Sequence, residues 1–172
     1  MLEKEPVLRS NCLNIIKPTN KKEANQMIKI PIKVLIVDDE KDFVEMFSLR
    51  LSGQGEKVST AFSGRQALEI LEQVSIDVVV LDIRMPGMDG IDTLKQIKAL
   101  HPLVEVILLT GHGSTETAVE GMKSGAFDYL MKPADFEDIK IKLENARSRK
   151  DEQEERIRQA EVRLLLRRSG DL

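Results

Sequence analysis

Short apolar runs alternate with amphipathic segments along residues 32–143, and this alternation predicts five strands that are each followed by a helix. The central run, Ile76–Leu81, is rich in valine and too short for a helix, which is typical of a strand buried on both faces of a parallel sheet. Further strands are predicted at 33–37, 57–61, 104–109 and 127–131. Five such units indicate an α/β fold, a doubly wound five-stranded parallel sheet with helices on both faces.

Capping residues support the predicted helix starts. Ser63 and Gln66 have the spacing of a capping box, and Asp89 and Asp135 each stand where a helix N-cap is expected. Apolar side chains at helical spacing predict the buried faces of these helices, among them Phe47, Leu49, Leu71, Val74, Leu94 and Leu100.

The last helical pattern runs from Asp135 to about Arg167, which is too long for one helix packed on this small sheet. Glu154 and Arg158 are expected to pair along it. The pattern predicts an extended C-terminal helix over 144–172 that forms a coiled coil in a homodimer or docks on a partner; the alternative is a charged helix that frays. Polar residues interrupt its heptad seam, which consists of Ile139, Leu143, Ala146, Lys150, Gln153, Ile157, Ala160 and Leu164.

Composition places these elements in one domain with tails. The chain has 172 residues, of which 41% are hydrophobic, enough for one good core. A net charge of −3 gives no general reason to bind nucleic acid, so no direct nucleic-acid partner is expected. Cys12 stands alone and excludes an intrachain disulfide, and no apolar run has the length of a membrane span. We expect a cytoplasmic protein with a flexible N-terminal arm at 1–31.

Polar side chains follow four of the predicted strands. Asp38 and Asp39 follow the first strand, Asp82 the third, Thr110 the fourth and Lys132 the fifth. Because the carboxyl ends of parallel strands meet at one edge, these groups are expected to converge there. Three close carboxylates repel one another unless a cation lies among them, and oxygen ligands without histidine or cysteine suit Mg²⁺. The edge therefore suits a phosphoryl group on Mg²⁺, with lysine and hydroxyl groups contacting its oxygens.

Four motifs around these residues belong together: VDDE at 37–40, LDIRMPGMDG at 81–90, LTGHG at 109–113 and DYLMKP at 128–133. With them, residues 32–143 resemble the receiver domain of the two-component response regulators, and the stretch from 111 to 133 is similar to receivers of the nitrogen-regulator type. The resemblance implies a flavodoxin-like sheet with strand order 2-1-3-4-5.

The resemblance also implies roles for the site residues. Asp82 would be the phosphoacceptor, phosphorylated by a sensor histidine kinase or a phosphotransfer protein. Asp39 and Asp82 would bind Mg²⁺ directly, Asp38 would hold it largely through water, and the backbone carbonyl of Arg84 would complete the ligands. Lys132 would balance charge during phosphoryl transfer.

A switch is implied as well. The Thr110 hydroxyl would move toward the phosphorylated aspartate and the Tyr129 ring would turn inward, so that the surface of the fourth helix, fifth strand and last helix repacks. Arg84 and His112 flank the site in positions that could tune the lifetime of the phosphorylated form.

The same residues are compatible with two other functions. No turnover of an external substrate is expected, only self-phosphorylation and autodephosphorylation. One alternative is an Asp-nucleophile phosphatase, although such enzymes carry the nucleophile after the first strand; the other is a scaffold that is not phosphorylated and acts through its C-terminal helix. The chain is either a stand-alone receiver or the receiver and linker of a longer transcriptional regulator.

Overall fold

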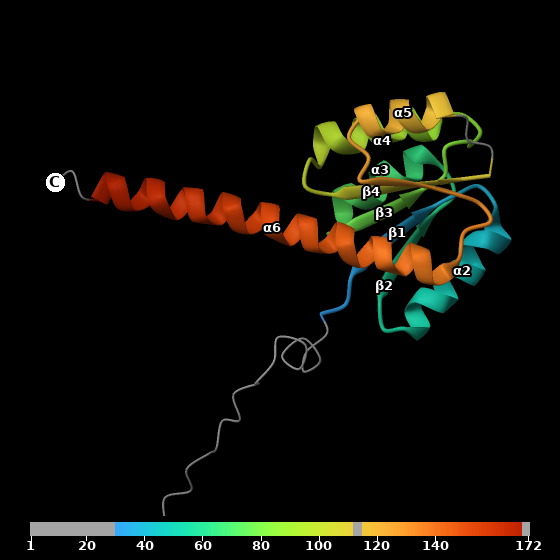
Figure 1. Cartoon of the computed structure of the whole chain (residues 1–172), viewed down its shortest axis with the longest axis horizontal. Helices are drawn as coiled ribbons and strands as arrows, with labels where there is room; N and C mark the ends of the chain where they lie inside the picture. Colours follow the sequence, from blue (N-terminus) through green and yellow to red (C-terminus); the bar gives the residue numbers. More distant parts are fainter. Residues whose placement is uncertain (1–29, 112–114, 170–172) are drawn as a thin grey trace, which may run out of the picture. The chain divides into compact units, whose positions relative to one another are not determined.

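A computed structural model describes residues 30–111 and 115–169. The N-terminal arm predicted at 1–31 therefore lies almost entirely outside the described residues. Figure 1 shows the fold, in which strands and helices alternate along the chain. The elements are β1 Lys33–Val37, α2 Lys41–Gly53, β2 Lys57–Ala61, α3 Gly64–Gln73, β3 Val78–Leu81, α4 Gly90–Leu100, β4 Glu105–Thr110, α5 Thr115–Lys123, β5 Asp128–Met131 and α6 Phe136–Ser169.

The five strands form one parallel sheet in the order β2-β1-β3-β4-β5. β3 is the central strand, and all four of its residues are buried. Its last residue, Leu81, lies beside Val37 of β1 and Leu108 of β4, while Thr110 lies beside Met131 of β5. The register thus brings the carboxyl ends of four strands to one edge, and both the predicted fold class and the strand order are confirmed.

Helices cover both faces of the sheet, with α3, α4 and α5 on one side and α2 and α6 on the other (Figure 1). Each face has its own apolar core. Leu71 of α3 and Leu94 of α4 pack with Val79 and Leu81 on the first face. Phe47 of α2 and Leu143 of α6 pack with the other side of the strands. This two-sided burial explains why the strands are runs of apolar residues rather than alternating patterns.

The predicted caps are present. Ser63 Oγ accepts a hydrogen bond from the Gln66 amide, and Asp89 accepts one from the Asp92 amide. The capping box differs in one detail, because the Gln66 side chain accepts from the amide of Phe62 rather than from that of Ser63. Asp135 precedes α6 and accepts from the Glu137 amide.

Three predicted core positions are wrong. Leu49 is 74% exposed, because it lies two residues from both Phe47 and Leu51 and so points away from the face that they share. Val74 is the residue that caps the end of α3, and Leu100 is the last residue of α4. Both helices end just there, and these side chains are exposed.

α6 is 34 residues long and changes character along its length. Its first part packs on the sheet, with Ile139, Leu143, Ala146 and Lys150 all buried. The predicted seam is therefore not one continuous surface: its first half belongs to the domain's own core, and packing continues past the predicted boundary at residue 143. In its second half Ile157, Ala160 and Leu164 are exposed and Gln153 is half-buried.

The expected pairing of Glu154 with Arg158 is not found in α6. Glu154 instead pairs with Lys150 at 3.4 Å, and Arg158 pairs with Glu155. Of the helices in the described ranges, none is both long and apolar enough to cross a membrane.

Candidate functional site

The loops after β1 and β3 place three carboxylates at the carboxyl edge of the sheet. A hydrogen bond of 2.9 Å from the Asp82 amide to the Val37 carbonyl joins the ends of β3 and β1 there. Asp38, Asp39 and Asp82 each offer a carboxylate oxygen, and these oxygens lie within 4.8 Å of one another. The structure thus brings together the three acidic residues that the sequence pattern selected.

The donor set of this cluster fits a hard divalent cation. Asp38 and Asp82 are buried, whereas Asp39 is exposed and leaves one side of the cluster open to solvent. Mg²⁺ takes oxygen ligands, uses few of them from the protein and keeps several waters. An acidic group of this size with an open side offers both protein oxygens and room for water or phosphate oxygens.

Without a cation, the environment works against a charge on Asp82. Burial and, after it, the nearby Asp38 carboxylate raise the pKa of the Asp82 carboxyl to about 6, although Lys132 opposes the shift. A bound cation would lower this pKa by compensating the same charges. The cluster is therefore electrostatically incomplete, which is the condition expected of an anionic site that receives a metal ion.

Lys132 follows β5 and reaches the same edge. Its amine donates to Asp38 at 2.5 Å and to Glu40 at 3.3 Å, and it lies 4.3 Å from the centre of the Phe43 ring. Burial disfavours the charge on this amine, but the hydrogen bond to Asp38 and the charges of Asp38 and Asp82 raise the pKa of Lys132 above its ordinary value. Lys132 is thus held as a cation beside the acidic cluster.

Gly90 allows the backbone around the acidic loop to close up. A Cβ at this position would lie 2.3 Å from the Asp82 carbonyl oxygen and 2.6 Å from the Ile83 Cα, so only glycine fits. The Gly90 amide donates to the Ile83 carbonyl at 2.8 Å. The start of α4 is thereby fastened to the loop that carries Asp82.

The structure describes three of the four remaining predicted residues, Thr110, Tyr129 and Arg84. Thr110 ends β4 and is buried at the same edge. Tyr129 of β5 is half-buried against the core cluster on the α3 and α4 face, and no hydrogen bond from a described residue reaches its buried hydroxyl. Arg84 is exposed in the loop after Asp82, and the role of its carbonyl stays a prediction. His112 lies outside the described residues.

Two contacts of the site were not predicted. Glu40 and Phe43 both contact the amine of Lys132. Glu40 stands in the VDDE motif, which hinted at a role; the position of Phe43 in the helical pattern suggested only a core residue.

The comparisons with known proteins agree with this geometry. The model of the response regulator receiver domain matches residues 34–144, and the chain therefore belongs to that family. Among curated relatives, it is 48% identical over 115 residues to the transcriptional regulatory protein ZraR of Escherichia coli K12, covering 67% of this chain and 26% of that protein. It is 41% identical over 122 residues to the DNA-binding transcriptional regulator NtrC of the same strain, covering 71% and 26%. The predicted likeness to nitrogen-regulator-type receivers is confirmed.

Solved structures show the same fold. A response regulator receiver domain protein from Clostridium thermocellum superimposes with a TM-score of 0.67 at 41% identity, covering 70% of this chain and 97% of that one. By contrast, the chain spans only about a quarter of the length of the curated relatives named above. What those longer proteins do as a whole is therefore a separate matter from the receiver.

Proposed function

We propose that this chain is a phosphorylation-controlled receiver in which Asp82 accepts a phosphoryl group from a histidine of a sensor kinase or of a phosphotransfer protein. The observation that carries the proposal is the incomplete charge balance at the carboxyl edge. Asp82 is buried next to Asp38 and close to Asp39, and its pKa is raised to about 6. Family membership supplies the reaction class, since receivers act with a kinase or phosphodonor.

The chemistry needs no separate base. Asp82 is mostly ionised at pH 7 even with a pKa of about 6, so a carboxylate oxygen can attack phosphorus directly. The new bond joins this oxygen to phosphorus while the bond from phosphorus to the donor histidine nitrogen breaks. Attack of water on the acyl phosphate later releases inorganic phosphate and restores the carboxylate. We expect no turnover of an external substrate.

Mg²⁺ would offset the negative charge that gathers between the carboxylates and the phosphoryl oxygens. Asp39 and Asp82 are assigned as direct ligands, Asp38 as a ligand largely through water, and the Arg84 carbonyl as the remaining protein ligand. Lys132 would leave its hydrogen bond with Asp38 to contact a phosphoryl oxygen. Its pairing with Asp38 at 2.5 Å keeps it charged and close by.

Thr110 and Tyr129 would carry the signal from the site to the surface formed by α5, β5 and α6. The Thr110 hydroxyl would contact a phosphoryl oxygen. The Tyr129 ring already packs inward in this structure, so phosphorylation would hold it there. Thr110→Ala should leave phosphorylation intact and uncouple it from binding at this surface; unchanged coupling in that variant would refute the switch.

Arg84 and His112 are proposed to tune the lifetime of the phosphorylated form by shielding the attacking water. Replacing both with alanine should change the rate at which the acyl phosphate is lost. An unchanged rate would remove both residues from the mechanism.

The part of α6 after Lys150, which carries the exposed seam residues, is proposed to pair with a second copy of the chain. Ile157 and Leu164 are 45% and 60% exposed along the seam. Arg156 and Glu161 flank the same seam five residues apart, which is the separation at which opposite charges meet across a parallel two-stranded coiled coil. The same pairing would suit a stand-alone receiver or the receiver and linker of a longer transcriptional regulator.

The deciding experiment is incubation of the whole chain with Mg²⁺ and acetyl phosphate, followed by intact mass measurement. We expect one phosphoryl adduct that requires Mg²⁺ and is lost in Asp82→Asn. If neither acetyl phosphate nor a cognate kinase gives an adduct, the protein is a scaffold that acts through α6. If the chain instead turns over p-nitrophenyl phosphate, it is an Asp-nucleophile phosphatase.

A further inference from the structure

The amino-terminal edge of the sheet, at the opposite end of the strands, holds a second group of buried carboxylates that the proposed function does not use. Glu56 accepts a hydrogen bond of 2.6 Å from the amide of Ile32 just before β1. Asp77 immediately precedes β3 and is 3% exposed; Glu105 begins β4 and is 0% exposed. Buried carboxylates without compensation are costly, so their partners identify what this edge does.

Asp77 is held mainly by α6. One of its oxygens accepts from the Lys150 amine at 2.8 Å, and the other accepts from the Arg147 guanidinium and from the Lys33 amide, at 3.0 Å in the latter case. Burial alone would raise the pKa of Asp77, but these hydrogen bonds and the two positive charges hold it below its ordinary value. Both oxygens are thus occupied, and two of the partners come from neighbouring turns of one helix.

Lys150 is the last buried residue on the docked face of α6, at 7% exposure. Besides Asp77, its amine donates to the Ile76 carbonyl at 3.1 Å and lies 3.4 Å from the Glu154 carboxylate. The amine thus makes two hydrogen bonds and, in addition, an ion pair with Glu154. The lysine is therefore a structural cation rather than a nucleophile or a ligand-binding group.

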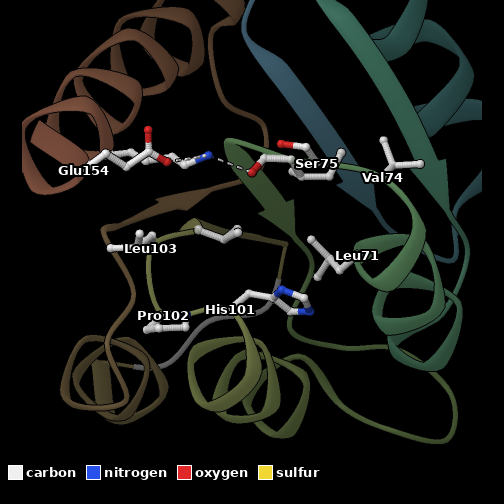
Figure 2. Close-up of a pocket in the computed structure, with 10 residues that line it drawn as sticks. Leu71, Val74, Ser75, His101, Pro102, Leu103 and Glu154 are labelled. Atoms are coloured by element: carbon white, nitrogen blue, oxygen red, sulfur yellow. Dashed lines mark hydrogen bonds and ion pairs between the residues drawn. The ribbon is translucent and has the colours of Figure 1, made fainter. Parts of the chain in front are cut away.

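Lys150 lines a pocket of about 290 Å³, which is drawn in Figure 2. It lies between α6, which contributes Glu154, and the connections before β3 and β4, which contribute Ser75 and His101. Because the Lys150 amine already pairs with Asp77, Ile76 and Glu154, it is not a free anchor for a ligand in this pocket. The charged groups of Lys150 and Asp77 instead attach α6 to the sheet.

We propose that Asp77, Arg147 and Lys150 form a helix clamp, which fixes the point and the rotation at which α6 leaves the sheet. The apolar contacts of Ile139 and Leu143 hold the helix to the sheet without a defined direction, since hydrophobic packing is not directional. Arg147 and Lys150, three residues apart on α6, each bind a different oxygen of the Asp77 carboxylate. These two contacts define the direction of the helix. Fixing register is the best supported role of buried polar groups.

The clamp has a consequence for assembly that rests on the proposed homodimer. Lys150 occupies the seam position just before Gln153, and the clamp keeps it in its own domain. The seam open to a second copy therefore begins at Gln153 and continues through Ile157, Ala160 and Leu164. The clamp therefore sets the orientation of each receiver domain relative to the coiled coil that the two α6 helices form.

Thiol labelling of the whole chain tests the clamp, in a Cys12→Ser background. Ala146→Cys places a buried thiol on α6 just before the clamp, and Ala67→Cys places one on α3 against the opposite face of the sheet. Adding Asp77→Asn should speed labelling at 146 by about 10- to 100-fold, because the buried Lys150 and the half-buried Arg147 lose the carboxylate that ties them to the sheet, and should speed it much less at 67. Equal acceleration at both positions would reduce the cluster to general stability and overturn the clamp, as would no acceleration.

Matched variants sharpen this test. Glu152→Gln removes an exposed acid of α6 that pairs only with Arg156 among the ion pairs of the described residues, and it should leave labelling at 146 unchanged. Lys150→Met keeps the apolar stem and leaves Asp77 with Arg147, so its effect should be several-fold smaller than that of Asp77→Asn. A larger effect of Lys150→Met would contradict the central place of Asp77.

A separate measurement tests the homodimer. In the same background, Ala160→Cys lies in the seam and should form an intermolecular disulfide with diamide, whereas Val162→Cys lies on the far side and should not. Failure of this selectivity would refute the homodimer through α6 while leaving the labelling result for the clamp intact.

Discussion

Both edges of the sheet gather buried carboxylates, but they differ in how the negative charge is balanced. At the carboxyl edge, Asp82 lies beside Asp38, and its pKa is raised to about 6 because Lys132 does not offset burial and repulsion. At the amino edge, Asp77 is satisfied by Lys150 and Arg147, and its pKa is lowered. One short strand, Val78–Leu81, separates the two aspartates.

The difference shows that burial of a carboxylate does not by itself indicate function. What distinguishes the two edges is whether the protein supplies the compensating charge from its own side chains. A complete set of partners fixes a structural element, here α6. An incomplete set, as at Asp82, leaves the carboxylates dependent on a bound cation for charge compensation. Substitutions at the two edges should therefore have opposite effects on stability.

The largest effect is expected at the amino edge. Asp77→Asn should lower the free energy of unfolding by about 3 kcal/mol, because it removes the buried carboxylate that pairs with the buried Lys150 ammonium. Lys150→Met should cost only about 1 kcal/mol, since Asp77 keeps Arg147 and the stem stays packed. Urea unfolding of the two variants measures both values. Equal losses would show that the carboxylate is not the centre of the cluster.

Asp82→Asn should act in the other direction. In EDTA at pH 7, it should raise the free energy of unfolding by about 1 to 2 kcal/mol. The shift of the Asp82 pKa from 3.8 to about 6 corresponds to about 3 kcal/mol, and imperfect hydrogen bonding of the amide reduces the gain. Saturating Mg²⁺ should stabilise wild type more than the variant. A destabilised Asp82→Asn protein in EDTA would mean that the carboxylate is well compensated without metal.

The pH dependence should separate the edges by sign. Asp82 has a raised folded pKa, so in EDTA the unfolded chain ionises first, and wild type loses stability relative to Asp82→Asn as the pH rises from about 4 to 6. Asp77 has a lowered folded pKa, so its stabilising effect is complete above pH 4 and fades as the pH falls through the folded value. Urea unfolding from pH 3 to 8 of wild type and both variants gives these differences. Parallel curves for Asp82→Asn and wild type would contradict the raised pKa.

The smallest effect concerns the hydroxyl of Tyr129. Because this group is buried and receives no hydrogen bond from the described residues, Tyr129→Phe should raise the free energy of unfolding by about 1 kcal/mol. Thermal and urea unfolding of the unphosphorylated protein measure the change. A clear loss of stability would show that the hydroxyl has a partner in solution, and would argue against a ring held inward in the resting state.

Sequence patterns predicted the carboxyl edge far better than the amino edge. Asp38, Asp82 and Lys132 each follow an apolar run, and parallel topology alone brings strand ends together. Asp77 and Lys150 gave no such signal. In the heptad pattern Lys150 was an interruption of a coiled coil, and its carboxylate partner lies 73 residues earlier in the chain. Periodicity assigns a residue to a face of a helix; it does not identify what that face meets.

The same limit explains the smaller errors in the fold. The caps at Ser63 and Asp89 rest on hydrogen bonds within a few residues, and these were predicted correctly. The strands β1, β3 and β4 were recognised because each is a short, mostly apolar run buried on both faces. Leu49 and Val74 depend on helix rotation and on the residue at which a helix ends, which tertiary packing decides. Glu40 and Phe43 became part of the site only through Lys132, which lies 92 residues after Glu40.

The clamp also determines where this receiver can be cut. The family match ends at residue 144, before Arg147 and Lys150. A fragment trimmed at that point would keep Asp77 at the base of the central strand and remove both side chains that neutralise it. Engineers who graft this receiver onto another output module should therefore place the junction beyond Glu154, since about three helical turns after residue 144 carry the side chains that neutralise Asp77 and the Glu154 partner of Lys150.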